Sequence, residues 1–221
     1  MLLSMVVRDA KMFGPVVEIR RQIQCVLGHP EIRIFDQITN RGNVRCPHNW
    51  LYHVNLGYPL LDKGARLIFR GQLTNVFDLP SVAPKSGRKL DPNRIKRVPE
   101  PLPEHAGSGE RGVIVVPPAD RNGDAHIGLI NPRLGLGVEL IFPTEAMPRF
   151  ANWQHFGPGG SYVTGLEPFT GTLLGRSQDP YPEAVQHLDP GQTKRYQLTI
   201  RVLTTRVQCK AFAKHDGPVT S

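Results

Sequence analysis

Cysteine is scarce in this sequence, with three residues among 221. Cys25, Cys46 and Cys209 are widely spaced and form no CxxC pair, which argues against a thiolate zinc site and against a disulfide framework. The histidines show no spacing that is diagnostic of a metal site, so we predict no metal. This use of cysteine fits a reducing compartment best, and we expect a cytoplasmic protein.

Long apolar runs are also missing. No stretch approaches the ~20 apolar residues that a membrane-spanning helix needs. The apolar start, Met1 to Val7, is too short for the core of a signal peptide, and no basic segment precedes it. We therefore expect no membrane among the partners of this chain.

Aromatic residues make up 7% of the chain, whereas its net charge is +8. The basic residues are scattered, and the densest cluster, Lys85 to Arg97, has no interleaved aromatics. Surfaces that bind single-stranded nucleic acid combine positive charge with aromatic rings on which bases stack. The sequence therefore argues against nucleic acid as a partner.

Gly and Pro are abundant, with 22 and 21 residues and no repeat period. This composition favours many short strands joined by turns. Apolar and β-branched runs predict strands at 16–27, 32–39, 50–56, 65–69, 112–116, 125–130, 136–142, 162–167 and 195–204. Turns at 28–30 and 131–135 predict two hairpins, and residues from about 79 to 109 predict a long surface loop. We expect an all-β, mainly antiparallel sandwich with one domain over 1–207 and a C-terminal tail over 208–221.

Two titratable side chains lie in or beside predicted strands. His53 belongs to the phrase YHVNLG, and Glu167 belongs to the phrase VTGLEP. A His and a Glu on a rigid sheet suffice for paired general acid and base catalysis. Structural roles are the alternative, since Glu167 could pair with Arg176 and His53 could be a hydrogen-bonded core residue.

Two neighbours in the sequence could recognise a ligand. Asn55 lies two residues after His53 and would project to the same face of a strand, where it offers a hydrogen-bond donor and acceptor. Trp153 could be a core residue or a platform for the apolar face of a sugar ring.

Taken in order, these phrases resemble the aldose-1-epimerase-like proteins of the galactose mutarotase superfamily. The resemblance spans roughly residues 12 to 205 and corresponds to the C-terminal two-thirds of such a protein. The matching phrases are IFDQITNRG (34–42), YHVNLG (52–57), PLL (59–61), LINP (129–132), GLG (135–137), Trp153, GLEP (165–168), GR (175–176) and LDPGQ (188–192).

The resemblance implies a partial galactose mutarotase-like β-supersandwich with its site in a concave sheet. It implies that His53 protonates the ring oxygen of an aldose and that Glu167 removes the proton of the anomeric hydroxyl. Ring opening, rotation about C1 and closure then interconvert the anomers without a metal or organic cofactor. The predicted ligand is a monosaccharide or a sugar derivative, and its predicted binding residues are Asn55, Trp153, Asn131 and Arg176.

The resemblance also implies a missing part. Full-length members have an N-terminal half that supplies an Arg and another His, and nothing before residue 12 matches it. We therefore expect a truncated chain whose uncovered sheet edges lead to self-association, to a need for a partner or to marginal stability. One further polar residue of the family's site is unassigned, with Glu104, His105 and Asp120 as candidates.

Two other functions stay open at this point. The same concave face could bind carbohydrate without turnover. Alternatively, the chain could be a basic interaction module in which His53 and Glu167 are structural.

Overall fold

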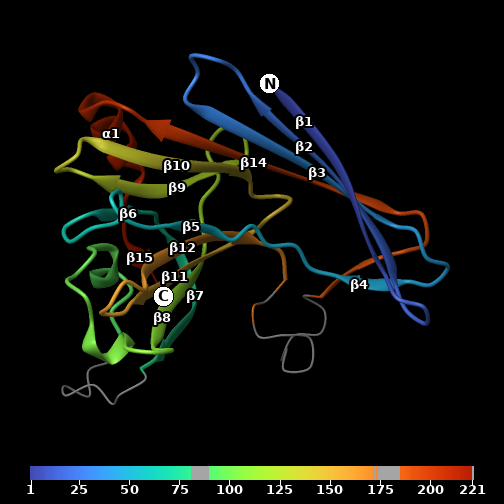
Figure 1. Ribbon diagram of the computed structural model, residues 1–221, viewed down its shortest axis with the longest axis horizontal. Coiled ribbons are helices and arrows are strands. Elements are labelled where there is room, and N and C mark those ends of the chain that lie inside the picture. The colour runs from blue at the N-terminus through green and yellow to red at the C-terminus, as the bar shows by residue number, and fades with distance from the viewer. Residues whose placement is uncertain (81–89, 172, 174–184, 221) are drawn as a thin grey trace.

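The computed structural model describes residues 1–80, 90–171, 173 and 185–220, which form two large sheets (Figure 1). Within these residues the first sheet has seven strands, in the order β1 (Leu2–Ala10), β2 (Val16–Cys25), β3 (Glu31–Asn40), β14 (Thr193–Leu203), β10 (Leu136–Pro143), β9 (Asp124–Asn131) and β6 (Arg66–Ile68). The second sheet has six, in the order β15 (Val219–Thr220), β7 (Gly71–Leu79), β8 (Glu110–Val116), β11 (Arg149–Phe156), β12 (Tyr162–Phe169) and β5 (Val54–Leu56). A small third sheet pairs β4 (Cys46–His48) with β13 (Gln186–Leu188). The predicted all-β, mainly antiparallel class is confirmed.

Both predicted hairpins are present, and their turns explain them. β2 pairs with β3 across a turn in which Gly28 has a φ of 81°, a left-handed conformation that suits glycine. β9 pairs with β10 across a turn that the Asn131 side chain closes. Its Oδ1 accepts hydrogen bonds from the backbone N–H groups of Arg133 and Leu134 at 3.0 and 3.2 Å.

β14 joins these two hairpins into one sheet. It lies between β3 and β10 and pairs with both in antiparallel register. Arg201 lies opposite Glu31 on one side and opposite Glu139 on the other, and it donates hydrogen bonds to both carboxylates. The strand that is near the end of the chain therefore lies in the middle of the sheet.

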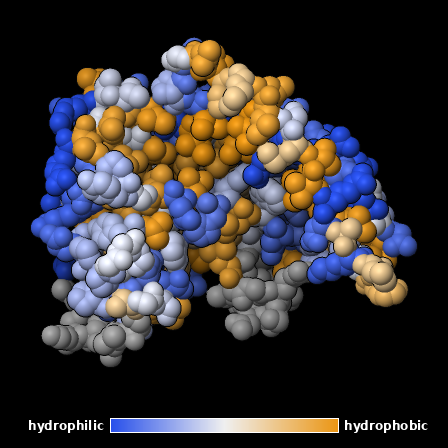
Figure 2. Space-filling model, in the orientation of Figure 1, coloured by the Kyte–Doolittle hydropathy of each residue, from blue (hydrophilic) through white to orange (hydrophobic). Residues whose placement is uncertain are grey.

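The core lies between the two sheets and is rich in phenylalanine. Phe69 and Phe150 pack edge to face with ring centroids 5.3 Å apart. Phe142 of the first sheet and Phe156 of the second are also fully buried, and burying each such ring stabilises the fold by roughly 1.5–3 kcal/mol. Figure 2 shows hydrophobic residues gathered over the centre of the molecule and hydrophilic residues along its left edge.

The last described residues connect both sheets. The short helix α1 (Arg206–Phe212) begins at a capping box formed by Thr205 and Gln208. Phe212 packs on the outer face of the first sheet against Gly128, where a Cβ would lie 2.9 Å from the Phe212 ring. After the turn η4 (Ala213–His215), β15 pairs in parallel with β7 of the second sheet.

The expected surface loop over 79–109 is only partly correct. Residues 81–89 lie outside the described residues. Residues 90–109 contain the turns η1 (Arg94–Lys96) and η2 (Pro103–His105) and bury Ile95, Val98 and His105. Lys96 is buried as well, because its Nζ donates to the Phe69 carbonyl at 2.6 Å and pairs with Asp216 at 3.0 Å.

Three of the longer strands were missing from the sequence prediction. They are β1, β7 and β11, whose apolar and polar residues do not alternate cleanly. All nine residues of β1 are exposed, and β1 forms one edge of the first sheet. In the described part of the chain, no helix is long and apolar enough to cross a bilayer.

Candidate active site

The outer face of the second sheet, which is turned away from the core, carries the predicted catalytic pair. Leu166 of β12 lies in the core, so the alternation of a strand turns Glu167 to the outer face. In β11, Phe150 and Phe156 lie in the core and Trp153 faces outward. The register places Trp153 opposite Gly165 and Gly165 opposite Asn55.

His53 lies one residue before β5 and reaches Glu167 on the neighbouring strand. The distance from His53 Nε2 to Glu167 Oε1 is 3.1 Å. The Glu167 side chain is 6% exposed, whereas the His53 side chain is 45% exposed. Among the described residues Glu167 Oε1 is buried and has no aligned hydrogen-bond partner, so this approach is a close contact and not an aligned hydrogen bond. The pair thus joins an accessible imidazole to a buried carboxyl group that still has bonding capacity.

Gly165 makes the space for this pair. A Cβ at position 165 would lie 2.3 Å from Glu167 Oε1 and 3.1 Å from His53 Cε1. Atoms at these distances overlap, so any side chain here would displace the carboxyl group or the ring. The glycine in the GLEP phrase is therefore explained by the close approach of the two titratable groups.

Trp153 packs beside the pair and is held from two sides. Its ring meets that of His53 edge to face, with centroids 5.8 Å apart. Its Nε1 donates a hydrogen bond of 2.6 Å to Glu110 Oε2 on β8. The His155 ring lies nearly parallel to it at a centroid distance of 6.1 Å, and His155 Nδ1 donates to the Gly109 carbonyl at 2.7 Å. These contacts fix the indole next to His53 and Glu167.

The electrostatics of the site favour proton transfer near neutral pH. Burial, and after it the negative charge of Glu110, raises the pKa of the Glu167 carboxyl from 4.5 to about 7. A proton acceptor is most effective when its pKa is close to the operating pH. Strongly shifted carboxyl groups also occur more often at functional sites than elsewhere.

The structure brings together four of the predicted residues and separates one. His53, Glu167, Trp153 and Asn55 share the outer face of the second sheet, and Asn55 is exposed. Asn131 lies at the end of β9 in the first sheet, where its amide also donates to the Leu60 carbonyl at 3.0 Å. Its side chain is therefore occupied in the turn. Arg176 lies outside the described residues.

The candidates for the unassigned polar residue fall in different places: Glu104 and His105 lie in η2, and Asp120 lies before β9. His105 is fully buried and its ring stacks on that of His155 at 6.0 Å. Burial lowers the pKa of His105 to about 4, and its Nδ1 accepts a hydrogen bond from the Phe156 N–H. Asp120 precedes β9 of the first sheet and contacts His126 at 3.3 Å.

Sequence reasoning missed Glu110 and the role of His155. Both reach the site through the register of β8 and β11 with β12, which no local phrase encodes. Across the described residues, the one group of three His, Cys, Asp or Glu ligand atoms close enough for a metal is His126, Glu139 and His215. That group belongs to the first sheet and to η4, away from the candidate active site.

Solved structures define the class of this fold. A Klebsiella pneumoniae protein described as a candidate aldose 1-epimerase matches 100% of this chain and 57% of its own, with a TM-score of 0.82 and 20% identity. A galactose mutarotase-related enzyme of Lactobacillus acidophilus matches 92% of this chain and 69% of its own, with a TM-score of 0.60 and 13% identity. A galactose mutarotase-like protein of Clostridium acetobutylicum matches 91% and 62%, with a TM-score of 0.60 and 14% identity. The chain therefore has the galactose mutarotase-like fold, as its sequence predicted.

The chain belongs to the family described as domain of unknown function (DUF4432), whose family model matches residues 1–202. No curated protein matches this chain. The chain spans 57% of the Klebsiella protein and 62% of the Clostridium protein. At identities of 13–20% these likenesses show the fold alone.

Proposed function

We propose that this chain interconverts the anomers of an aldose or of a sugar derivative, with Glu167 as the base and His53 as the acid. The observation that carries the proposal is the 3.1 Å approach of His53 Nε2 to a buried Glu167 carboxyl group. The names of the similar structures support a sugar as the substrate. The raised pKa of Glu167 supports its role as a base near neutral pH.

The reaction begins with Glu167 ionised and His53 protonated. Glu167 takes the proton of the C1 hydroxyl, and His53 gives its proton to the ring oxygen. The bond between C1 and the ring oxygen breaks, C1 becomes an aldehyde, and the ring oxygen becomes a hydroxyl. After rotation about the bond from C1 to C2, His53 takes back the proton of the new hydroxyl group, its oxygen attacks C1 from the other face, and Glu167 returns its proton to the carbonyl oxygen. The ring is then closed to the other anomer. Nothing is oxidised or reduced, and both side chains end as they began.

Neighbouring residues hold the sugar in this scheme. Trp153 offers an aromatic surface fixed by Glu110 and His155, on which the apolar face of a pyranose can rest. Asn55 offers a donor and an acceptor to the hydroxyl groups. Arg176 keeps its predicted role as a binding residue, whereas the turn contacts of Asn131 argue for a structural role there.

Polarimetry on freshly dissolved glucose and galactose tests the proposal. Glu167→Gln and His53→Asn should each reduce the catalysed rate by roughly 10²-fold or more, the usual contribution of a positioned proton-transfer group. Glu145→Gln changes an exposed carboxyl group and is the matched control, which should keep the wild-type rate. Equal rates in the wild type and both site variants would refute the assignment. Sugar binding without any acceleration would favour the carbohydrate-binding function instead.

A further inference from the structure

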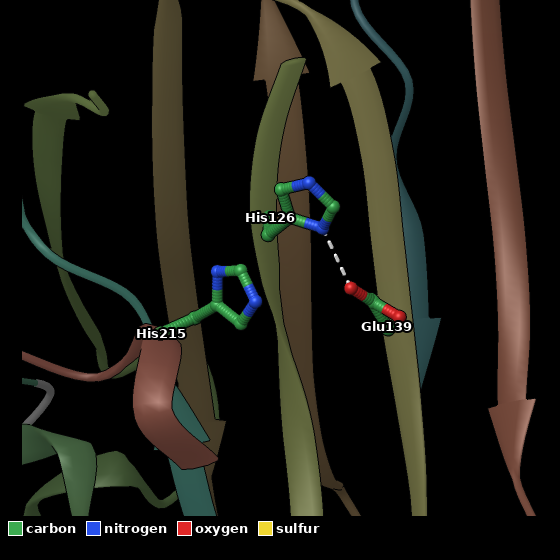
Figure 3. Close-up of side chains that lie close together, drawn as sticks. All are labelled: His126, Glu139 and His215. Carbon is green, nitrogen blue, oxygen red and sulfur yellow. Dashed lines mark hydrogen bonds and ion pairs between the residues drawn. The ribbon is translucent and has the colours of Figure 1, made fainter. Parts of the chain in front are cut away.

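A second cluster of titratable side chains lies on the outer face of the first sheet. His126 comes from β9, Glu139 from β10 and His215 from η4, after α1. Figure 3 shows the two imidazoles facing each other, with the Glu139 carboxylate on the neighbouring strand beside His126. One ligand atom from each residue lies within 4.8 Å of the other two. The residues are 13 or more positions apart in the sequence, so no short sequence motif indicates the cluster.

The His126 ring is held in the manner of a metal-binding histidine. Its Nδ1 lies 2.7 Å from Glu139 Oε1, and its Nε2 lies 3.3 Å from Asp120 Oδ2. Asp120 is fixed in turn, because its Oδ1 accepts from the backbone N–H groups of Asn122 and Asp124 at 2.8 and 3.0 Å. A histidine that binds a metal through one ring nitrogen commonly donates its other N–H to a carboxylate. Asp120 provides that carboxylate.

The other two ligands, His215 and Glu139, are also in place. The His126 and His215 rings stack with centroids 4.5 Å apart. Glu139 Oε2 accepts a hydrogen bond from Arg201 at 3.0 Å, which orients the carboxylate and leaves Oε1 for His126. A cavity of about 60 Å³ adjoins the rings and is lined by Arg70, Pro117, Asp120, Asp124, His126 and His215, among others. Since one water takes about 30 Å³ of liquid volume, the cavity has room for solvent beside His126 and His215, although Glu139 does not line it.

We infer that His126 Nδ1, Glu139 and His215 bind a divalent transition-metal ion, of which Zn²⁺ is the best fit. Two imidazoles and one carboxylate form a ligand set that zinc accepts together with water. The ion would take the place of the proton that His126 and Glu139 share. It would tie the C-terminal segment to the first sheet, at a place separate from the candidate active site.

Binding of zinc requires small movements of the three ligands. Zinc–nitrogen and zinc–oxygen bonds of about 2.0–2.2 Å place the donors of a tetrahedral site roughly 3.4 Å apart. His126 Nδ1 and Glu139 Oε1 must therefore separate slightly from 2.7 Å, and His215 must close in from at most 4.8 Å. His215 is half-buried in the short turn η4, outside both sheets, so this small movement disturbs no strand pairing. Arg70 and Arg201 add positive charge nearby, so the carboxylates of Asp120 and Glu139 are both needed to offset the repulsion between these arginines and a bound cation.

Zinc titration of the tag-free protein, dialysed against chelator, tests the inference. Calorimetry should give one Zn²⁺ per chain, and Co²⁺ should give the visible absorption of a tetrahedral nitrogen–oxygen site. His215→Ala and Glu139→Gln should abolish that absorption, and Asp120→Asn should weaken binding by about 10-fold or more because it frees the His126 ring. His29→Ala removes an exposed histidine elsewhere and should bind as the wild type does.

Circular dichroism checks that each variant is folded. His215→Ala decides the question if a strand variant fails to fold, since residue 215 lies outside both sheets. Absence of zinc binding in the wild type would overturn the inference and leave the cluster as an ion pair. Equal binding in the wild type and in folded His215→Ala would overturn it as well, because the ion would then sit elsewhere.

Discussion

Replacing Glu167 by Gln should change the pH dependence of stability in a way that follows from the burial of this carboxyl group. In the folded protein the pKa of Glu167 is raised from 4.5 to about 7, first by burial and then by Glu110. An acidic group whose pKa is higher in the folded than in the unfolded protein contributes its full stabilisation only while it is protonated. Its contribution is therefore complete below about pH 4.5 and is lost as the pH rises to about 7.

The size of the loss follows from the same shift. Each pH unit between the two pKa values corresponds to about 1.4 kcal/mol, so ionising Glu167 in the folded protein costs about 3 kcal/mol by pH 8. Gln has the same shape and no charge, and it avoids this cost. Glu167→Gln should therefore be more stable than the wild type at pH 8, by on the order of 3 kcal/mol, and nearly equal to it at pH 4.5.

Urea unfolding followed by far-UV circular dichroism at pH 4.5, 6, 7 and 8 measures this difference. Glu145→Gln, at an exposed position, should follow the wild type at every pH. A Glu167→Gln variant that is less stable than the wild type at pH 8 would refute the reasoning. That result would mean that the His53 contact compensates the buried charge fully and that the pair is a structural ion pair.

Two further substitutions test the candidate active site. Gly165→Ala should lower the mutarotation rate by roughly 10²-fold, the usual effect of moving a reacting group by about 1 Å. The reason is that a Cβ at this position would lie 2.3 Å from Glu167 Oε1. A wild-type rate in polarimetry would contradict the need for glycine. Glu110→Gln removes one of the two causes that raise the pKa of Glu167 but keeps an acceptor for the Trp153 N–H. The acidic limb of the rate profile should therefore move to lower pH, and an unchanged profile would show that Glu110 has no electrostatic effect on the base.

The sequence predicted the parts of the fold that local patterns encode. The β2–β3 and β9–β10 hairpins follow from β-branched runs and from turns with Gly28 and Asn131. β11 was not predicted because its inward residues include Asn152 and Gln154. In the core, Gln154 Nε2 donates hydrogen bonds to Asn152 Oδ1 and to the Ile95 carbonyl. Buried amides between phenylalanines break the alternation that identifies a strand.

Residues of the candidate active site could be chosen from the sequence only where a local phrase contains them. His53 and Glu167 stand in phrases that resemble a known family, so the sequence alone was enough to choose them. The place of Glu110 depends on the register of β8 with β11, and the His126–Glu139–His215 cluster depends on how η4 packs on the β9–β10 hairpin. A shift of one residue would turn Glu110 to the opposite face, and nothing in a single sequence fixes the long-range contacts that bring Glu110 and His215 to their places.

The central place of β14 has a consequence for how the chain is made. Ribosomes deliver the N-terminal strands first, yet β3 and β10 are joined through a strand that spans Thr193–Leu203. The edge of β3 in the β1–β3 ribbon therefore stays unpaired until β14 has been synthesised. Unpaired edges of partly made sheets are prone to pair with other chains. For this protein the period in which that edge is exposed ends only when β14 emerges from the ribosome, so aggregation during synthesis is the hazard that this strand order creates.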